Sequence, residues 1–143
     1  MKALVAKRAR ISRVRGVQHM LASSAAANAE AQVVTLETNA AKLASLRDSL
    51  TLSSGPTTGA VLQNRGELAQ RLDKARNGLT DAIVSARAAA EQKVAQRLEA
   101  RQRREAAAKL DAKAVQALTE WTELRMNAAF RPKGSKNVEQ GEN

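Results

Sequence analysis

The stretch Ser53-Ser54-Gly55-Pro56-Thr57-Thr58-Gly59 is the clearest interruption in this chain of 143 residues, and it decides the fold. Gly55 can end a helix in the left-handed conformation, and Pro56 cannot extend that helix because it has no backbone N–H. Thr57 or Thr58 can then cap the helix that follows. We therefore expect a loop over residues 53–59 between two helices.

The segment before this loop has a helical pattern. Residues 2–52 contain no proline, and their apolar residues recur in steps of three, four and seven rather than in alternation. A first stripe consists of Ile11, Val14, Leu21 and Ala25, and a second stripe, shifted in phase, consists of Val33, Leu36, Ala40, Leu43 and Leu50. We expect a first helix over about 2–52 that turns these stripes toward a partner helix.

The segment after the loop predicts a second helix over about 60–129, again without proline. Its apolar face comprises Val61, Leu68, Leu72, Leu79, Ala82 and Ala86, and continues through Val94, Leu98, Val115, Leu118, Trp121 and Leu124. Asn77-Gly78 is a common turn pair, which leaves a three-helix alternative open. The helical spacing on both sides favours one continuous helix. Pro132 and Gly134 end it, and residues 131–143 are expected to form a disordered tail.

The composition favours a rod over a compact domain. Trp121 and Phe130 are the only aromatic residues, and Ala, which buries little surface, dominates the apolar content. We expect an all-α fold: an elongated antiparallel two-helix coiled-coil hairpin with an overhanging C-terminal helix. A fold at Pro56 would pair residue i with about residue 112−i. Residues 2–15 would then lie beside 97–110, and 113–130 would overhang.

The charge is strongly positive and unevenly placed. There are 24 Lys and Arg residues against 14 Asp and Glu, a net charge of +10, and the first carboxylate is Glu30. The predicted pairing gathers cations at the end of the hairpin away from the loop; this "basic open end" comprises Lys7, Arg8, Arg10, Arg13, Arg15, Arg97, Arg101, Arg103 and Arg104. Clustered like charges favour an external acidic partner, and the alternative is a solvated face that only confers solubility. The aromatic overhang adds Trp121, Leu124 and Phe130 as candidate contacts, with self-association or fold-back onto the hairpin as alternatives.

No catalytic, cofactor or metal site is expected, and we predict that the protein is not an enzyme. His19 is the only histidine and there is no cysteine, which argues against a zinc site. Carboxylates stand at the i,i+4 spacing of helix-stabilising ion pairs, as in Glu67 with Arg71 and Glu99 with Arg103. No apolar run approaches the ~20 residues that span a bilayer, and the basic N-terminal segment does not resemble a secretory signal.

Nucleic-acid binding is the main rival to a protein-binding role, because clustered arginines alone give non-specific affinity. The basic segments, however, have no aromatic residues for base stacking and no zinc-finger or helix-turn-helix pattern. A generic coiled-coil scaffold is a further alternative.

Several stretches resemble the FliJ family of flagellar type III export proteins and its YscO-type injectisome relatives. They are the Arg-rich segment 91–105, Leu110-Asp111, the segment 120–131 with Met126 and Phe130, and the Arg10/Arg13 spacing before an alanine-rich helix. The resemblance implies a cytoplasmic coiled-coil protein, peripheral at the inner-membrane export gate and shaped like the γ-subunit stalk of rotary ATPases. It implies that the protein binds the hexameric export ATPase centrally, promotes its assembly and contacts the gate, with export substrates or chaperones as further partners. Whether the apparatus is flagellar or an injectisome stays open.

Overall fold

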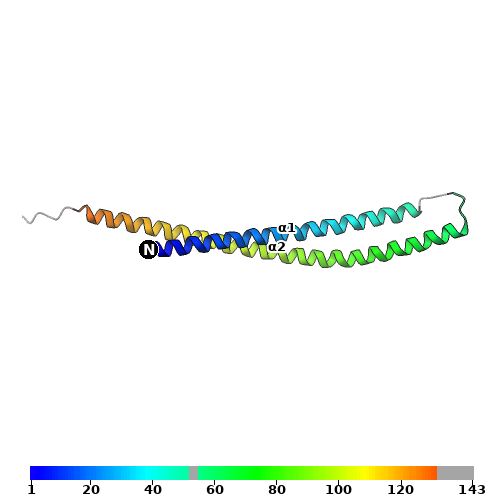
Figure 1. Cartoon of the computed structure of the whole chain (residues 1–143), viewed down its shortest axis with the longest axis horizontal. Coiled ribbons are helices and arrows are strands. Elements are labelled where there is room, and N and C mark those ends of the chain that lie inside the picture. The colour runs from blue at the N-terminus through cyan, green and yellow to red at the C-terminus, as the bar shows by residue number, and fades with distance from the viewer. Residues whose placement is uncertain (52–54, 132–143) are drawn as a thin grey trace, which may run out of the picture.

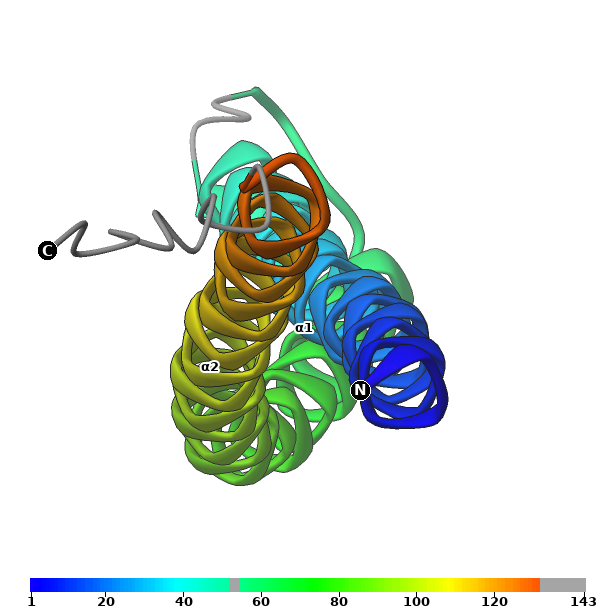
Figure 2. The same ribbon diagram turned by 90° about the vertical axis from the view of Figure 1, so that its left-hand side faces the viewer.

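The computed structural model describes residues 1–51 and 55–131, and these form two long helices joined by a loop. Helix α1 spans Lys2–Thr51 and helix α2 spans Gly59–Ala129. The helices run antiparallel along one another as an elongated hairpin (Figure 1), and the view along the rod shows that they wind about each other (Figure 2). The predicted all-α two-helix hairpin is confirmed.

The helix ends follow from local chemistry. Thr58 caps α2: its backbone is extended, and its Oγ1 accepts a hydrogen bond from the Val61 N–H at 3.4 Å. At the other end, the Phe130 N–H donates to the Met126 carbonyl oxygen at 3.0 Å. Helix α2 continues through Asn77-Gly78, so the prediction of one continuous helix is confirmed.

The prediction that Gly55 caps the first helix is wrong. Helix α1 ends at Thr51, and no glycine among the described residues has a positive φ, so Gly55 does not close α1 in the left-handed conformation. The predicted end of the first helix at residue 52 and most of the predicted tail, residues 132–143, lie outside the described residues.

The register of the hairpin differs from the one expected for a fold centred on Pro56. Arg47 pairs with Asp73, Glu37 pairs with Arg87, and His19 faces Arg104; the two residue numbers of each pair add up to 120–124 rather than 112. The connection between Thr51 and Gly59 has seven residues and can span up to ~23 Å when extended. It therefore does not force a symmetrical fold, and the packing between the helices sets the register.

This register explains the exposure of side chains at both ends. The first turns of α2 extend beyond the end of α1 (Figure 1), so Val61 and Leu68 are exposed although they were expected on the buried face. At the open end, continuing the register of the His19–Arg104 contact along both helices sets the start of α1 beside about residue 120 of α2. The overhang is therefore shorter than the predicted 113–130 and begins near Trp121.

The N-terminal half of α1 packs in a way that its sequence did not predict. The face toward α2 carries small or polar side chains, including Ser12, His19 and Ala26, and Ala26 is completely buried. The expected stripe of Ile11, Val14 and Leu21 is exposed instead. Bulky aliphatic side chains would hold the helices apart, whereas small ones allow the close approach that buries Ala26.

The C-terminal half of α1 packs as expected. Its second stripe, Val33, Leu36, Ala40, Leu43 and Leu50, is half-buried against α2, and so are Leu72, Leu79, Ala82 and Ala86 opposite. Arg47 Nε donates to Asp73 Oδ1 at 3.3 Å, and Arg87 Nε donates to Glu37 Oε1 at 3.1 Å. Among the described residues only Ala26, Ala90 and Ala107 are buried, so the rod has a narrow seam rather than a core.

Candidate partner-binding surfaces

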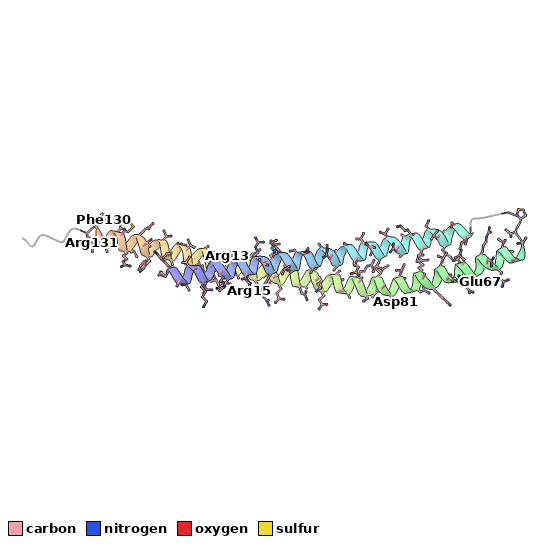
Figure 3. The ribbon with its side chains drawn as sticks, in the orientation of Figure 1. Arg13, Arg15, Glu67, Asp81, Phe130 and Arg131 are labelled. Carbon is pink, nitrogen blue, oxygen red and sulfur yellow. The ribbon has the colours of Figure 1, made fainter. Side chains whose placement is uncertain are left out.

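Most of the net charge lies on the half of the rod away from the loop. Residues 1–29 carry six cations and no carboxylate, and residues 97–120, on the neighbouring part of α2, carry six cations and four carboxylates. These two segments therefore account for +8 of the net +10. Carboxylates such as Glu67 and Asp81 lie nearer the loop, while Arg13 and Arg15 lie on the basic half (Figure 3).

The arginines of α2 are partly neutralised within their own helix. Arg101 Nε donates to Glu105 Oε1 at 2.9 Å, and Arg103 pairs with Glu99, as the i,i+4 spacing predicted. The other pair expected from spacing, Glu67 with Arg71, does not form in the described part of the chain. Arg104 Nη1 lies 3.5 Å from His19 Nδ1 across the seam.

The cations in the first 15 residues of α1 form no ion pair within the described part of the chain. Arg15 Nη1 donates to the Gln18 side chain at 2.9 Å, a neutral contact that leaves its charge uncompensated. Lys7, Arg8, Arg10 and Arg13 form no ion pair with any described residue, and neither does Arg97 on α2. An uncompensated cluster of this kind attracts anionic groups from outside the molecule.

The structure brings the two basic segments together only in part. A groove of about 250 Å³ between the helices is lined by Arg8, Ile11 and Arg15 of α1 and by Arg103, Ala106, Ala107 and Leu110 of α2. Arg97, Arg101 and Arg104 line a separate groove of about 780 Å³ beside His19 and Ser23. Residues 8–15 therefore lie beside 103–110, which confirms part of the expected pairing. The shifted register sets Arg97, Arg101 and Arg104 beside residues 19–23 instead.

The three candidate residues of the overhang remain accessible. Leu124 is 70% exposed and Phe130 79% exposed, whereas Trp121 is partly covered by the Arg125 guanidinium, which stands 5.1 Å from the centre of its ring. Phe130 and Arg131 lie at the tip of α2 (Figure 3). Trp121 and Phe130 are therefore two separate exposed side chains on the part of α2 that extends beyond α1, and they do not line one pocket.

The described residues show no arrangement suited to metal or membrane insertion. They contain no group of three or more side chains that could hold a metal ion, and neither α1 nor α2 has an apolar stretch able to cross a bilayer. Among residues 1–51 and 55–131, Asp111 Oδ1 is the one buried side-chain oxygen that has no hydrogen bond.

Sequence reasoning missed one surface feature, the outward orientation of the apolar stripe on the N-terminal half of α1. Leu4, Val14 and Leu21 are exposed and flanked by arginines, and Ile11, at the edge of the seam, lines the groove with Leu110. The signal that could have found it is the small-residue face of Ser12, Gly16 and Ala26 on the other side of the same helix.

Comparison with protein-family models, with curated proteins and with solved structures found no match for this chain.

Proposed function

We propose that this chain is a coiled-coil component of a bacterial type III export apparatus, flagellar or injectisome, that acts in the cytoplasm as the central stalk and assembly factor of the export ATPase and contacts the export gate. The observation that supports this most is the gathering of unpaired cations at the open end of a thin rod. The resemblance of segments 91–105 and 120–131 to the FliJ family adds to it.

The dimensions of the rod suit a stalk. A helix of 71 residues is about 107 Å long at 1.5 Å per residue, and two packed helices are about 20 Å across. Such a rod can enter the centre of a ring by one end while the other end remains outside. The open end carries +8 of the charge and the overhanging tip of α2, so it is the end proposed to enter an acidic ring.

A pull-down with the full chain from the cytoplasm of a bacterium that has an export apparatus tests this function. At moderate salt the chain should recover the export ATPase or a gate component. A matched pair of variants separates the proposed surface from general charge: Lys7, Arg8, Arg10 and Arg13 changed to Gln should lose the ATPase, whereas Lys42, Arg71, Lys74 and Arg76 changed to Gln should keep it. Both variants have the same net charge.

The second candidate, nucleic-acid binding, is favoured by the same unpaired arginines and makes the opposite prediction. If the chain recovers RNA or DNA alone, with an affinity that falls steeply with salt concentration, the stalk function is contradicted.

A further inference from the structure

The outer face of α1 carries an aliphatic stripe that stays exposed beside α2, with Ile11 at the edge toward the seam. Leu4, Ile11, Val14 and Leu21 follow one another in steps of seven, three and seven, and their exposed fractions run from 37% for Ile11 to 66% for Leu21. Steps of three, four and seven define the a and d positions of a coiled-coil seam. Helix α1 therefore has two seams in its first half, and only the one of small residues is occupied by α2.

Every charged residue along this second seam is basic. With Leu4 and Ile11 at a positions and Val14 and Leu21 at d positions, Arg8 and Arg15 occupy e positions and Arg10 occupies a g position. In a coiled coil the e and g residues face those of the partner helix and decide which helix it accepts. Lys7 takes the remaining d position, and no carboxylate occurs before Glu30 to offset these charges.

The charge pattern rejects a second copy of this chain as the occupant. Parallel pairing sets g against e, and antiparallel pairing sets e against e and g against g, so each arrangement opposes arginine to arginine. The shape of the stripe disfavours a lipid surface. Helices that lie in a membrane interface often carry Trp or Phe on a continuous apolar face. This face has no aromatic residue, and Arg10 and Arg13 interrupt it beside the exposed Val17 and Met20.

We propose that the outer face of α1 over Leu4–Leu21 binds an amphipathic helix of another protein that has aliphatic residues at its a and d positions and Glu or Asp at its e and g positions. The groove of about 250 Å³ at the edge of the stripe supports this occupant, because Ile11 and Leu110 line it together with three guanidinium groups, those of Arg8, Arg15 and Arg103. A partner carboxylate there would be held by Arg8 and Arg15, since Arg103 is already paired with Glu99.

This inference names the recognition chemistry of part of the basic open end and to that extent rests on the proposed function. The test uses the full chain and a labelled synthetic helix of four heptads with Leu at a and d and Glu at e and g. Fluorescence anisotropy at low and at physiological salt should show binding, and a matched peptide with Lys at e and g should bind at least about tenfold more weakly. The assay contains no ATPase, so its failure is distinguishable from failure of the proposed function.

Two matched variants locate the binding. Val14→Glu on the stripe should weaken binding of the acidic peptide at least about tenfold. Val34→Glu, at an exposed position of α1 outside the stripe, should leave the affinity unchanged. Circular dichroism should show equal helix content in both. Equal binding of the acidic and basic peptides, equal loss in the two variants, or binding only to vesicles of equal parts phosphatidylglycerol and phosphatidylcholine would each overturn the proposal.

Discussion

Ala26 shows at the scale of a single residue how the two helices are held together. It has no exposed surface, and the other two buried side chains of the described residues, Ala90 and Ala107, are also alanines. An alanine side chain contributes little hydrophobic free energy, but it lets two helix backbones approach closely. The seam is therefore determined at these positions by the fit of small side chains.

Enlarging Ala26 should push the helices apart. We expect Ala26→Leu to lower the free energy of unfolding by about 1–3 kcal/mol, because the extra atoms have no space in a fully buried position. Urea unfolding followed by circular dichroism measures this change. The neighbouring Ala27→Leu, at an exposed position, should change it by less than about 0.5 kcal/mol. A more stable Ala26→Leu protein would show that the helices are not in close contact there.

The sequence predicts burial correctly in one half of α1 and wrongly in the other. Around Val33 and Leu36 the large aliphatic residues face α2, as their spacing predicts. Around Val14 and Leu21 the prediction of burial is wrong, because a helix with two stripes can turn either stripe toward its partner. Only the position of the partner backbone decides between them, and no local signal contains that position.

At the scale of the element, the ends of the helices follow from nearby residues. Thr58, one of the two caps that the sequence predicts, caps α2, and the helical spacing around Asn77-Gly78 correctly outweighs the turn signal of that pair. The register could not be obtained in this way. Alanine recurs along both helices, so many registers bury similar surface, and the loop is long enough to permit several of them.

Gly78 weakens α2 without any packing reason. A Cβ atom built on it meets nothing within 4 Å. We expect Gly78→Ala to raise the free energy of unfolding by about 1 kcal/mol through helix propensity alone. The reverse change at an exposed alanine of the same helix, Ala88→Gly, should lower it by a similar amount, and thermal unfolding measures both. If Gly78→Ala were destabilising, α2 would break at this position in solution.

The ion pair between Glu37 and Arg87 reports the register. Both side chains are largely exposed, so we expect a coupling free energy of only about 0.2–1 kcal/mol. Glu37→Arg and Arg87→Glu should each destabilise the hairpin, and the double exchange should recover the loss in a double-mutant cycle at low salt. The control combines Glu37→Arg with Arg76→Glu, because a fold symmetrical about Pro56 would place Arg76 close to Glu37. Coupling between Glu37 and Arg76, and none between Glu37 and Arg87, would contradict the register.

At the scale of the whole molecule, the rod separates a nearly neutral half from a basic one. The sequence alone located the cations, and the i,i+4 spacing identified Arg103 as paired. It could not show that Lys7, Arg8, Arg10 and Arg13 have no carboxylate across the seam, because that depends on the register. It also placed Arg97 beside the N-terminal cations, whereas the structure sets Arg97 in the groove with His19.

We propose that the unpaired cations of the open end engage the export ATPase, so the rate of ATP hydrolysis by that purified enzyme is the measurement to make. The full chain should raise both the rate and the hexameric fraction of the enzyme. Half-maximal stimulation should need about tenfold more of the variant with Lys7, Arg8, Arg10 and Arg13 changed to Gln. It should need an unchanged concentration of the variant with Lys42, Arg71, Lys74 and Arg76 changed to Gln. An unchanged rate of hydrolysis at saturating chain, or an equal loss in the two variants, would contradict the claim.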